Sequence, residues 1–218
     1  MLEALAGRHP GIIGYSEYKK YAVTVPVVER GGQENILFEV RAGSLRRQPG
    51  EICFPGGKLE AGEDFAEAAI RETMEALQIG RHQIQMIAPM DVYISPAGQM
   101  IMPYLVRLTD YEETMNPSEV EEVFFVPATY FLENEPSCFR NKVYTQVAED
   151  FPVDKIPGGK SYPWYSGWND VCFYEPDGRV IWGLTARIMK SVAGIIKQIN
   201  DGGMKMNTYG QFFENGNK

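Results

Sequence analysis

Cysteine and histidine are both scarce in this sequence. Its 218 residues include three cysteines, Cys53, Cys138 and Cys172, and two histidines, His9 and His82. The cysteines are odd in number and lack metal-ligand spacing, which argues against a zinc motif and a disulfide-rich secreted fold. The histidines lie far apart in polar contexts, which argues against covalent catalysis by a histidine-activated nucleophile. We therefore predict reduced thiols and a cytoplasmic protein.

Positive charge is also in short supply. The sequence has 21 Lys and Arg against 29 Asp and Glu, a net charge of −8. Such a balance argues against general binding to nucleic acid or to anionic membranes. No apolar run approaches the length of a membrane span, and the first residues, MLEALAGRHPG, lack the apolar core of a signal peptide. An acidic protein that acts on phosphates needs a cation or a local basic patch at its site.

The chain does contain enough apolar residues for a sizeable core, at 44% hydrophobic and 12% aromatic. Its length and the lack of internal repeats predict one compact domain over residues 1–200. The remaining residues, 201–218, are rich in Gly and Asn, and we predict that they form a mobile tail.

Runs of β-branched and aromatic residues predict strands, and apolar residues at helical spacing predict two helices. The turn residues at 95–98 and 176–178 are typical of hairpins. The Pro- and Gly-rich stretch 152–169 predicts a long loop. The predicted strands are 21–28, 36–41, 85–93, 100–108, 123–126, 170–174 and 179–182, and the predicted helices follow Asp64 and cover 185–199.

The stretch from Gly57 to Ile79, GKLEAGEDFAEAAIRETMEALQI, combines a glycine turn with an amphipathic helix. Asp64 and Glu67 form a plausible capping box at the start of this helix. A turn that exposes backbone carbonyls, followed by helix carboxylates, is what a hard cation such as Mg²⁺ needs. The alternative is an ordinary salt-bridge ladder on a solvated helix, because Glu67, Arg71 and Glu75 follow one another at four-residue intervals.

Four cations gather around the entry to this glycine turn. They either pair with the abundant surface carboxylates or form a rim that binds phosphate. The guanidinium fork of arginine suits phosphate oxygens, so such a rim would orient a substrate as well as attract it. The four residues are Arg41, Arg46, Arg47 and Lys58.

The pattern of glycine, five residues, glutamate, seven residues and Arg-Glu resembles the Nudix box. The matching positions are Gly57, Glu63, Arg71, Glu72, Glu75 and Ile79. Two positions depart from the family pattern, since Ala76 stands for a glutamate of the metal clamp and Gln78 for a glycine that ends the helix. The resemblance implies an α/β protein with the Nudix fold, a mixed β-sheet sandwiched between α-helices. The box helix would lie on one side and the C-terminal helix on the other.

A narrower resemblance covers most of residues 20–195. The run LRRQPGEICFPGGK looks like the motif before the box in the coenzyme A diphosphatase branch, with Gln48 where that motif often has histidine. The segments 116–127 and 180–188 are similar to later segments of that branch. The implied activity is hydrolysis of the diphosphate linkage of a nucleoside diphosphate derivative, coenzyme A or an acyl-coenzyme A. An ADP-ribose or NADH diphosphatase stays open, as does a weakly active or inactive binding module owing to Ala76.

The resemblance also implies a site that uses Mg²⁺ or Mn²⁺ and takes a small nucleotide substrate in a monomer or a homodimer. In the family, a glutamate from a later loop completes the metal site or serves as the base. The aromatic residues of 152–169 either pack over the edge of the core or form a lid that stacks on an adenine ring. The implied metal ligands are Glu72 and Glu75 with a backbone carbonyl of Gly57 or its neighbour Gly56, and the implied catalytic residues are Arg71, Glu72, Glu75 and either Glu119 or Glu122.

Overall fold

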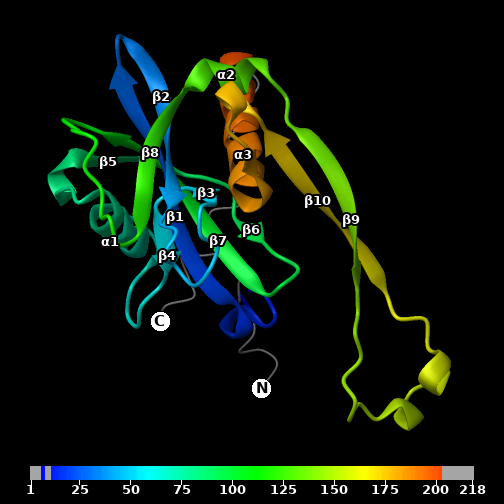
Figure 1. The fold of residues 1–218 in the computed structure, drawn as a ribbon. Coiled ribbons are helices and arrows are strands. Elements are labelled where there is room, and N and C mark those ends of the chain that lie inside the picture. Colours follow the sequence, from blue (N-terminus) through cyan, green and yellow to red (C-terminus); the bar gives the residue numbers. More distant parts are fainter. Residues whose placement is uncertain (1–5, 8–10, 203–218) are drawn as a thin grey trace.

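The computed structural model describes residues 6–7 and 11–202, so most of the predicted tail, 203–218, lies outside the described residues. Within them, strands and helices follow one another as shown in Figure 1. The strands are β1 (Lys19–Arg30), β2 (Gln33–Arg41), β3 (Ile52–Cys53), β4 (Gly56–Lys58), β5 (Ile84–Pro89), β6 (Tyr93–Ile94), β7 (Gln99–Leu108), β8 (Val120–Pro127), β9 (Ser137–Tyr144), β10 (Ser166–Tyr174) and β11 (Ile181–Trp182). The α-helices are α1 (Phe65–Leu77), α2 (Ala128–Glu133) and α3 (Gly183–Asn200), and the 3-10 turns are η2 (Tyr15–Glu17), η3 (Arg81–Gln83), η4 (Val153–Lys155), η5 (Gly159–Ser161) and η6 (Pro176–Gly178).

The larger sheet has eight strands and is mixed. Its main order is β3-β2-β1-β7-β5, with β4 beside β1, β6 beside β7 and β8 beside β2. β1 runs parallel to β7, whereas the other neighbouring pairs are antiparallel. The mixed sheet implied by the family resemblance is therefore confirmed.

Helices cover both faces of this sheet (Figure 1). Successive side chains of a strand point to opposite faces, and β2 shows how this divides the core. Leu37 packs in one cluster with Leu77 of α1, whereas Phe38 packs in another with Phe131 of α2 and Met189 of α3. The predicted placement of the two long helices on opposite sides of the sheet is confirmed.

The predicted elements are correct in kind, but several differ in their bounds. The strand predicted over 85–93 is divided, because β5 ends at Pro89 and the short β6 follows after a gap. Strand β9 is absent from the predicted strands, because its side chains are almost all exposed and no alternation of apolar residues marks it in the sequence. No helix in the described part of the chain is both long and apolar enough to cross a membrane.

The smaller sheet has the order β11-β10-β9, and its β9–β10 pair projects from the body of the molecule as a long arm (Figure 1). The predicted loop over 152–169 is wrong at its end, because β10 begins at Ser166. Aromatic residues pack against one another near the tip, with the ring centroid of Trp164 5.3 Å from Phe151 and 5.0 Å from Tyr162. The tip lies away from α1 (Figure 1), and these aromatic residues belong to none of the core clusters, so the predicted packing over the core edge is wrong for them.

The prediction of three reduced thiols is wrong for two of them. Cys138 and Cys172 lie directly opposite each other on β9 and β10 and form a disulfide, whereas Cys53 is free. The two cysteines are 34 residues apart in the sequence, and only the register of the strands brings them together. The prediction of a cytoplasmic protein was based on reduced thiols, and the disulfide removes this support.

Candidate active site

The start of α1 follows the sequence prediction. Asp64 Oδ1 accepts a hydrogen bond from the N–H of Glu67 at 2.8 Å, and Glu67 Oε2 accepts one from the N–H of Asp64 at 3.0 Å. The predicted capping box is confirmed, and it stabilises the first turn of the helix. On the buried side, Thr73 Oγ1 lies 2.7 Å from Thr24 Oγ1 of β1. Helix α1 is thus tied to the sheet, and it also packs against β4, which contains the glycine turn.

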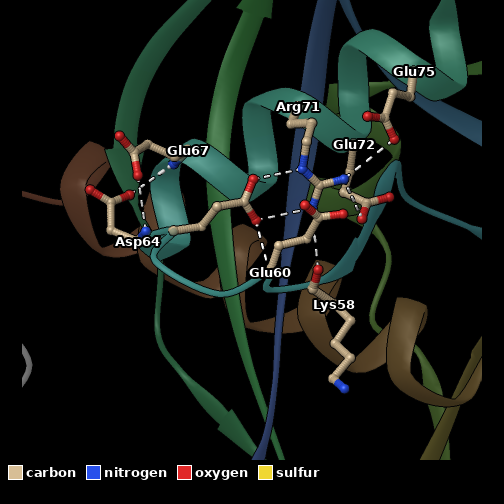
Figure 2. A network of polar contacts seen from close by, with 8 residues as sticks. Lys58, Glu60, Asp64, Glu67, Arg71, Glu72 and Glu75 are labelled. Carbon is tan, nitrogen blue, oxygen red and sulfur yellow. Dashed lines mark hydrogen bonds and ion pairs between the residues drawn. The ribbon is translucent and has the colours of Figure 1, made fainter.

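Arg71 lies at the centre of the polar network in Figure 2. Its Nε and Nη2 donate to the two carboxylate oxygens of Glu63 at 2.6 and 3.1 Å, and Nη2 also donates to the carbonyl oxygen of Lys58 at 3.2 Å. Its Nη1 donates to Glu72 Oε1 at 2.9 Å and to Glu75 Oε2 at 3.3 Å. The hydrogen bond from Arg71 lowers the pKa of Glu63. One guanidinium therefore binds three carboxylates and the turn before the helix.

The salt-bridge ladder considered as the alternative is only partly present. Glu67 is used by the cap, and the Arg71–Glu75 contact is the remaining step of the ladder. The Glu75 side chain is 52% exposed, and its bond to Arg71 is longer than those made by the other two carboxylates. Glu75 is therefore the carboxylate of this network that is most easily released to a ligand.

Glu72 lies against the glycine turn. Burial raises the pKa of its carboxyl, an effect that Arg71 opposes and that the negative charges of Glu75 and Glu119 reinforce. A Cβ atom at Gly57 would lie 2.2 Å from Cδ and Oε1 of Glu72. A residue without a side chain at position 57 therefore makes room for this carboxylate. The structure brings these two predicted metal-site residues side by side.

Ala76 is buried one turn further along the same helix, with 6% of its surface exposed. Its carbonyl oxygen accepts a hydrogen bond from the N–H of Asn116 at 2.7 Å, and the carbonyl oxygen of Leu77 accepts one from Thr114 Oγ1 at 2.6 Å. The loop before β8 is thus tied to the end of α1. Glu119 lies at the end of this loop, and its side chain is exposed.

Glu122 lies on the other face of the sheet. It pairs in β8 with Val40, which packs in the cluster on the α3 side. Both of its carboxylate oxygens accept hydrogen bonds from Arg179, at 2.6 and 2.9 Å, and these bonds lower the pKa of Glu122. Of the two candidates, Glu119 is the one whose charge acts on Glu72.

The four cations of the predicted phosphate rim lie on and around β2, β3 and β4. Arg41 Nε and Nη2 both donate to the carbonyl oxygen of Arg47 at 3.4 Å, whereas Arg46, Arg47 and Lys58 are exposed. Within residues 11–202, none of the four forms an ion pair with a carboxylate. The rim therefore keeps its positive charge next to the acidic network.

Glu39 is a residue that the sequence analysis did not single out. It lies in β2 with 4% of its surface exposed, and Cys53 Sγ donates to its Oε2 at 3.7 Å. Its Oε1 is buried without a hydrogen-bond partner. Burial raises the pKa of its carboxyl to about 8, opposed by Cys53 and Arg41 and reinforced by Glu119 and Glu72. The available signal was a single acidic residue inside the apolar run ILFEV.

Comparison with known proteins decides the family. The NUDIX domain model matches residues 19–145. The chain belongs to the Nudix hydrolase family. It is 37% identical over 134 residues to a mouse protein named peroxisomal coenzyme A diphosphatase NUDT7, a match of 61% of this chain and 56% of that protein. The Nudix chain thus spans little more than half of the mouse protein.

Two further comparisons extend over different shares of the chain. An uncharacterized Nudix hydrolase, NudL of Salmonella paratyphi B, is 26% identical over 177 residues, which are 80% of this chain and 81% of that protein. The crystal structure of an Ap4A hydrolase from C. elegans has 21% sequence identity and a TM-score of 0.44, and the match covers 53% of this chain and 84% of that chain. The resemblance to the Nudix family is confirmed, and the mouse relative agrees with the narrower resemblance to coenzyme A diphosphatases.

The donor set of this Nudix site suits a hard divalent cation. It offers the carboxylates of Glu72 and Glu75, with Glu72 lying against Gly57 in the glycine turn, and the unpartnered Oε1 of Glu39. In residues 6–7 and 11–202, no group of three or more His, Cys, Asp or Glu side chains is arranged to hold a metal by itself. Mg²⁺ is commonly bound by one or two carboxylates together with waters and substrate phosphates, so a set of this size fits it.

Proposed function

We propose that this Nudix protein is a divalent-cation-dependent diphosphatase that acts on a nucleoside diphosphate derivative of the coenzyme A type. The observation that carries the proposal is the fit of the Glu72 carboxylate against Gly57, inside the matched Nudix domain. This acidic site lies close to four cations that have no carboxylate partner among residues 11–202. Acidic groups that bind a cation, next to basic groups that bind phosphate, suit the hydrolysis of a diphosphate.

Each site residue has a separate role in this proposal. Glu72 and Glu75, with a carbonyl oxygen of Gly56 or Gly57, would hold Mg²⁺ or Mn²⁺. When bound, the ion offsets negative charge on the diphosphate and lowers the pKa of the attacking water. Arg71 is a positioning residue, because its 2.9 Å hydrogen bond orients Glu72. Glu119 completes the ligand set or accepts the proton of the attacking water.

The substrate class rests on the basic rim and on similarity. Arg41, Arg46, Arg47 and Lys58 bind the phosphates of a small nucleotide, and the net charge of −8 disfavours nucleic acid as the substrate. The name of the mouse relative supports coenzyme A or an acyl-coenzyme A. That relative is named as peroxisomal, and a cytoplasmic location for this chain stays a prediction.

The test compares coenzyme A, acetyl-coenzyme A, ADP-ribose and NADH as substrates of the full chain, with Mg²⁺ or Mn²⁺ and with EDTA. We expect the highest kcat/KM with coenzyme A or its acyl form, the products adenosine 3′,5′-diphosphate and a phosphopantetheine, and no turnover in EDTA. Preferential cleavage of ADP-ribose or NADH would contradict the substrate class. Unchanged turnover in EDTA would contradict the metal dependence.

A second candidate function is a ligand-binding module with weak or no turnover, and Ala76 is the observation that favours it. This buried alanine lacks a carboxylate at a position of the metal clamp. Loss of one stabilising group can cost about 3–4 kcal/mol of transition-state stabilisation. A silent wild type that gains strong activity on Ala76→Glu would favour the module. Brisk turnover by the wild type would rule it out.

A further inference from the structure

Glu39 holds a buried carboxylate oxygen, Oε1, without a hydrogen-bond partner, in a residue that is 4% exposed. The other oxygen accepts only a long bond from Cys53 Sγ, at 3.7 Å. Nearly all buried polar atoms in folded proteins have partners, so an exception calls for an explanation such as a bound ion.

The carboxylate of Glu39 lies on the face of the sheet that α1 covers. Side chains two positions apart on a strand share a face, and Glu39 follows Leu37 by two positions on β2. Leu37 packs in one cluster with Leu77 in the last turn of α1. Val123, the partner of Glu39 in β8, packs against the same cluster. Glu39 therefore faces the side of the sheet on which the last turn of α1 packs.

Two acidic side chains from other parts of the chain, Glu72 and Glu119, lie close enough to influence the carboxyl group of Glu39. The negative charges of Glu72 on α1 and Glu119 before β8 both raise the pKa of Glu39, which puts all three carboxylates within electrostatic reach of one another. Arg41 opposes them as a single cation. Carboxylates that converge in this way repel one another when ionised, and a cation bound between them offsets the repulsion.

Ala76 leaves helix α1 without one of the carboxylates of the Nudix box, and Glu39 offers a carboxylate from strand β2 instead. Residues four apart on a helix are neighbours, so position 76 shares a side of α1 with Glu72. The Nudix box has a glutamate there, and this chain has a buried methyl group. Glu39 comes from β2, on the face of the sheet that α1 covers.

We propose that Glu39 is a metal ligand of this site and takes the place of the carboxylate that Ala76 lacks. Glu39 Oε1 and the carboxylate of Glu72 would both contribute to holding the ion. The described side chains include no group of three acidic residues already arranged to hold a metal. The exposed side chain of Glu119 would therefore have to turn toward the ion in order to join Glu39 and Glu72. This inference rests on the proposed function for the presence of a divalent cation.

The experiment measures Mn²⁺ binding to the full chain by electron paramagnetic resonance of the free ion, without substrate. Glu39→Gln keeps the size of the side chain and removes its charge. We expect it to weaken Mn²⁺ binding by about tenfold or more, as the loss of a metal-supporting group does. Glu39→Gln combined with Ala76→Glu should recover most of the lost affinity, because the carboxylate returns to the helix.

The matched control is Glu121→Gln, which removes the same charge from an exposed glutamate of β8 and should change binding by less than about twofold. Glu72→Gln separates the two proposals. If the wild type binds Mn²⁺ and Glu72→Gln weakens binding while Glu39→Gln does not, the role of Glu39 fails and the metal site stands. If the wild type binds no Mn²⁺, the metal-dependent function fails together with the inference.

A second measurement does not depend on whether Glu39→Gln folds. A crystal of the wild-type protein grown with Mn²⁺ should show a carboxylate oxygen of Glu39 in direct contact with the ion. An ion bound by Glu72 without contact to Glu39 would overturn the inference.

Discussion

Arg71 donates hydrogen bonds to Glu63, Glu72 and Glu75. The different strengths of these bonds determine which of the three carboxylates can leave Arg71 and bind a ligand. The bond from Nε to Glu63, at 2.6 Å, is the shortest and is the main cause of the raised pKa of Arg71. The bond to Glu75 is the longest, and that side chain is 52% exposed. Glu63 therefore holds the guanidinium in place, Glu72 is oriented by it, and Glu75 is readily released to another partner.

Gly57→Ala tests the close approach between the turn and Glu72. The added Cβ would lie 2.2 Å from the carboxylate, which must move away. We expect Mn²⁺ affinity and kcat/KM for coenzyme A to fall by about tenfold or more, because the displaced carboxylate no longer faces the ion. The control is Gly43→Ala, where the nearest atom to the new Cβ is Glu121 Oε2 at 3.7 Å, an ordinary contact. Equal effects of the two substitutions would contradict this account.

The raised pKa of Glu39 predicts that the stability of the metal-free protein depends on pH. This pKa is raised from 4.5 to about 8 in the folded state, so between these values the unfolded chain has lost a proton that the folded protein keeps. The free energy of unfolding therefore falls as pH rises from about 4.5 to about 8, on the order of 3–5 kcal/mol for this group alone. Urea unfolding in EDTA at pH 5 and pH 8 measures the fall.

Glu39→Gln should remove this contribution, since glutamine does not titrate. The variant should be more stable than the wild type at pH 8 and closer to it at pH 5. Glu121→Gln should keep the wild-type slope. A wild type and a Glu39→Gln variant with equal slopes would show that Glu39 is ionised in the metal-free fold.

At the scale of elements, α1 is well defined at its start and strained at its end. Asp64 and Glu67 close a capping box around the first turn. The cap at the other end, Gln78, has φ 52° and ψ 47°, the left-handed conformation that favours glycine. The family pattern has glycine at this position. Glutamine in its place should therefore lower the free energy of unfolding, because it adopts the left-handed conformation less easily.

Gln78→Gly should therefore stabilise the protein. The exposed Gln78 side chain makes no hydrogen bond that the substitution would remove within residues 11–202, and glycine relieves the left-handed strain. We expect a gain of about 0.5–1 kcal/mol in the free energy of unfolding. Thermal unfolding of the wild type, Gln78→Gly and Gln78→Ala measures it. Alanine keeps the strain, so an equal gain from alanine would contradict the explanation.

At the scale of the whole molecule, the chain consists of a Nudix body and an arm that projects from it (Figure 1). The body contains the two core clusters that include residues of α1. The arm is anchored near its base, where Cys138 and Cys172 join β9 to β10 and α3 packs against β10. The far part of the arm exposes large aromatic residues, with Tyr165 84% and Trp168 60% exposed.

Replacing both cysteines of the disulfide by serine should loosen the arm and leave the site intact. A disulfide that closes a loop of 34 residues stabilises the folded state by about 3–4 kcal/mol in the chain-entropy model. Hydrogen exchange followed by mass spectrometry should show faster exchange in β9 and β10. Peptides from α1 and β1 should exchange as in the wild type. Faster exchange throughout the body would show that the disulfide supports the whole fold.

Local patterns could be predicted from the sequence because the interactions that make them join residues close in the chain. The capping box joins two residues three positions apart, and the apolar spacing of α1, α3 and the strands of the larger sheet depends on neighbours within a turn or a pair of residues. The Nudix box itself lies within 23 residues, from Gly57 to Ile79. These features led to the correct family, the mixed sheet and the two helix layers.

The order and kind of most elements, and the segment that contains Arg71, Glu72 and Glu75, can thus be read from the chain alone. Which distant residues meet that segment depends on how the strands pair and face in the folded protein. The strand register placed Cys138 opposite Cys172, and the alternation of faces turned Glu122 away from α1. The same alternation turned Glu39 toward α1. Register and facing are set by pairing between strands far apart in the chain, so no pattern within one segment contains them.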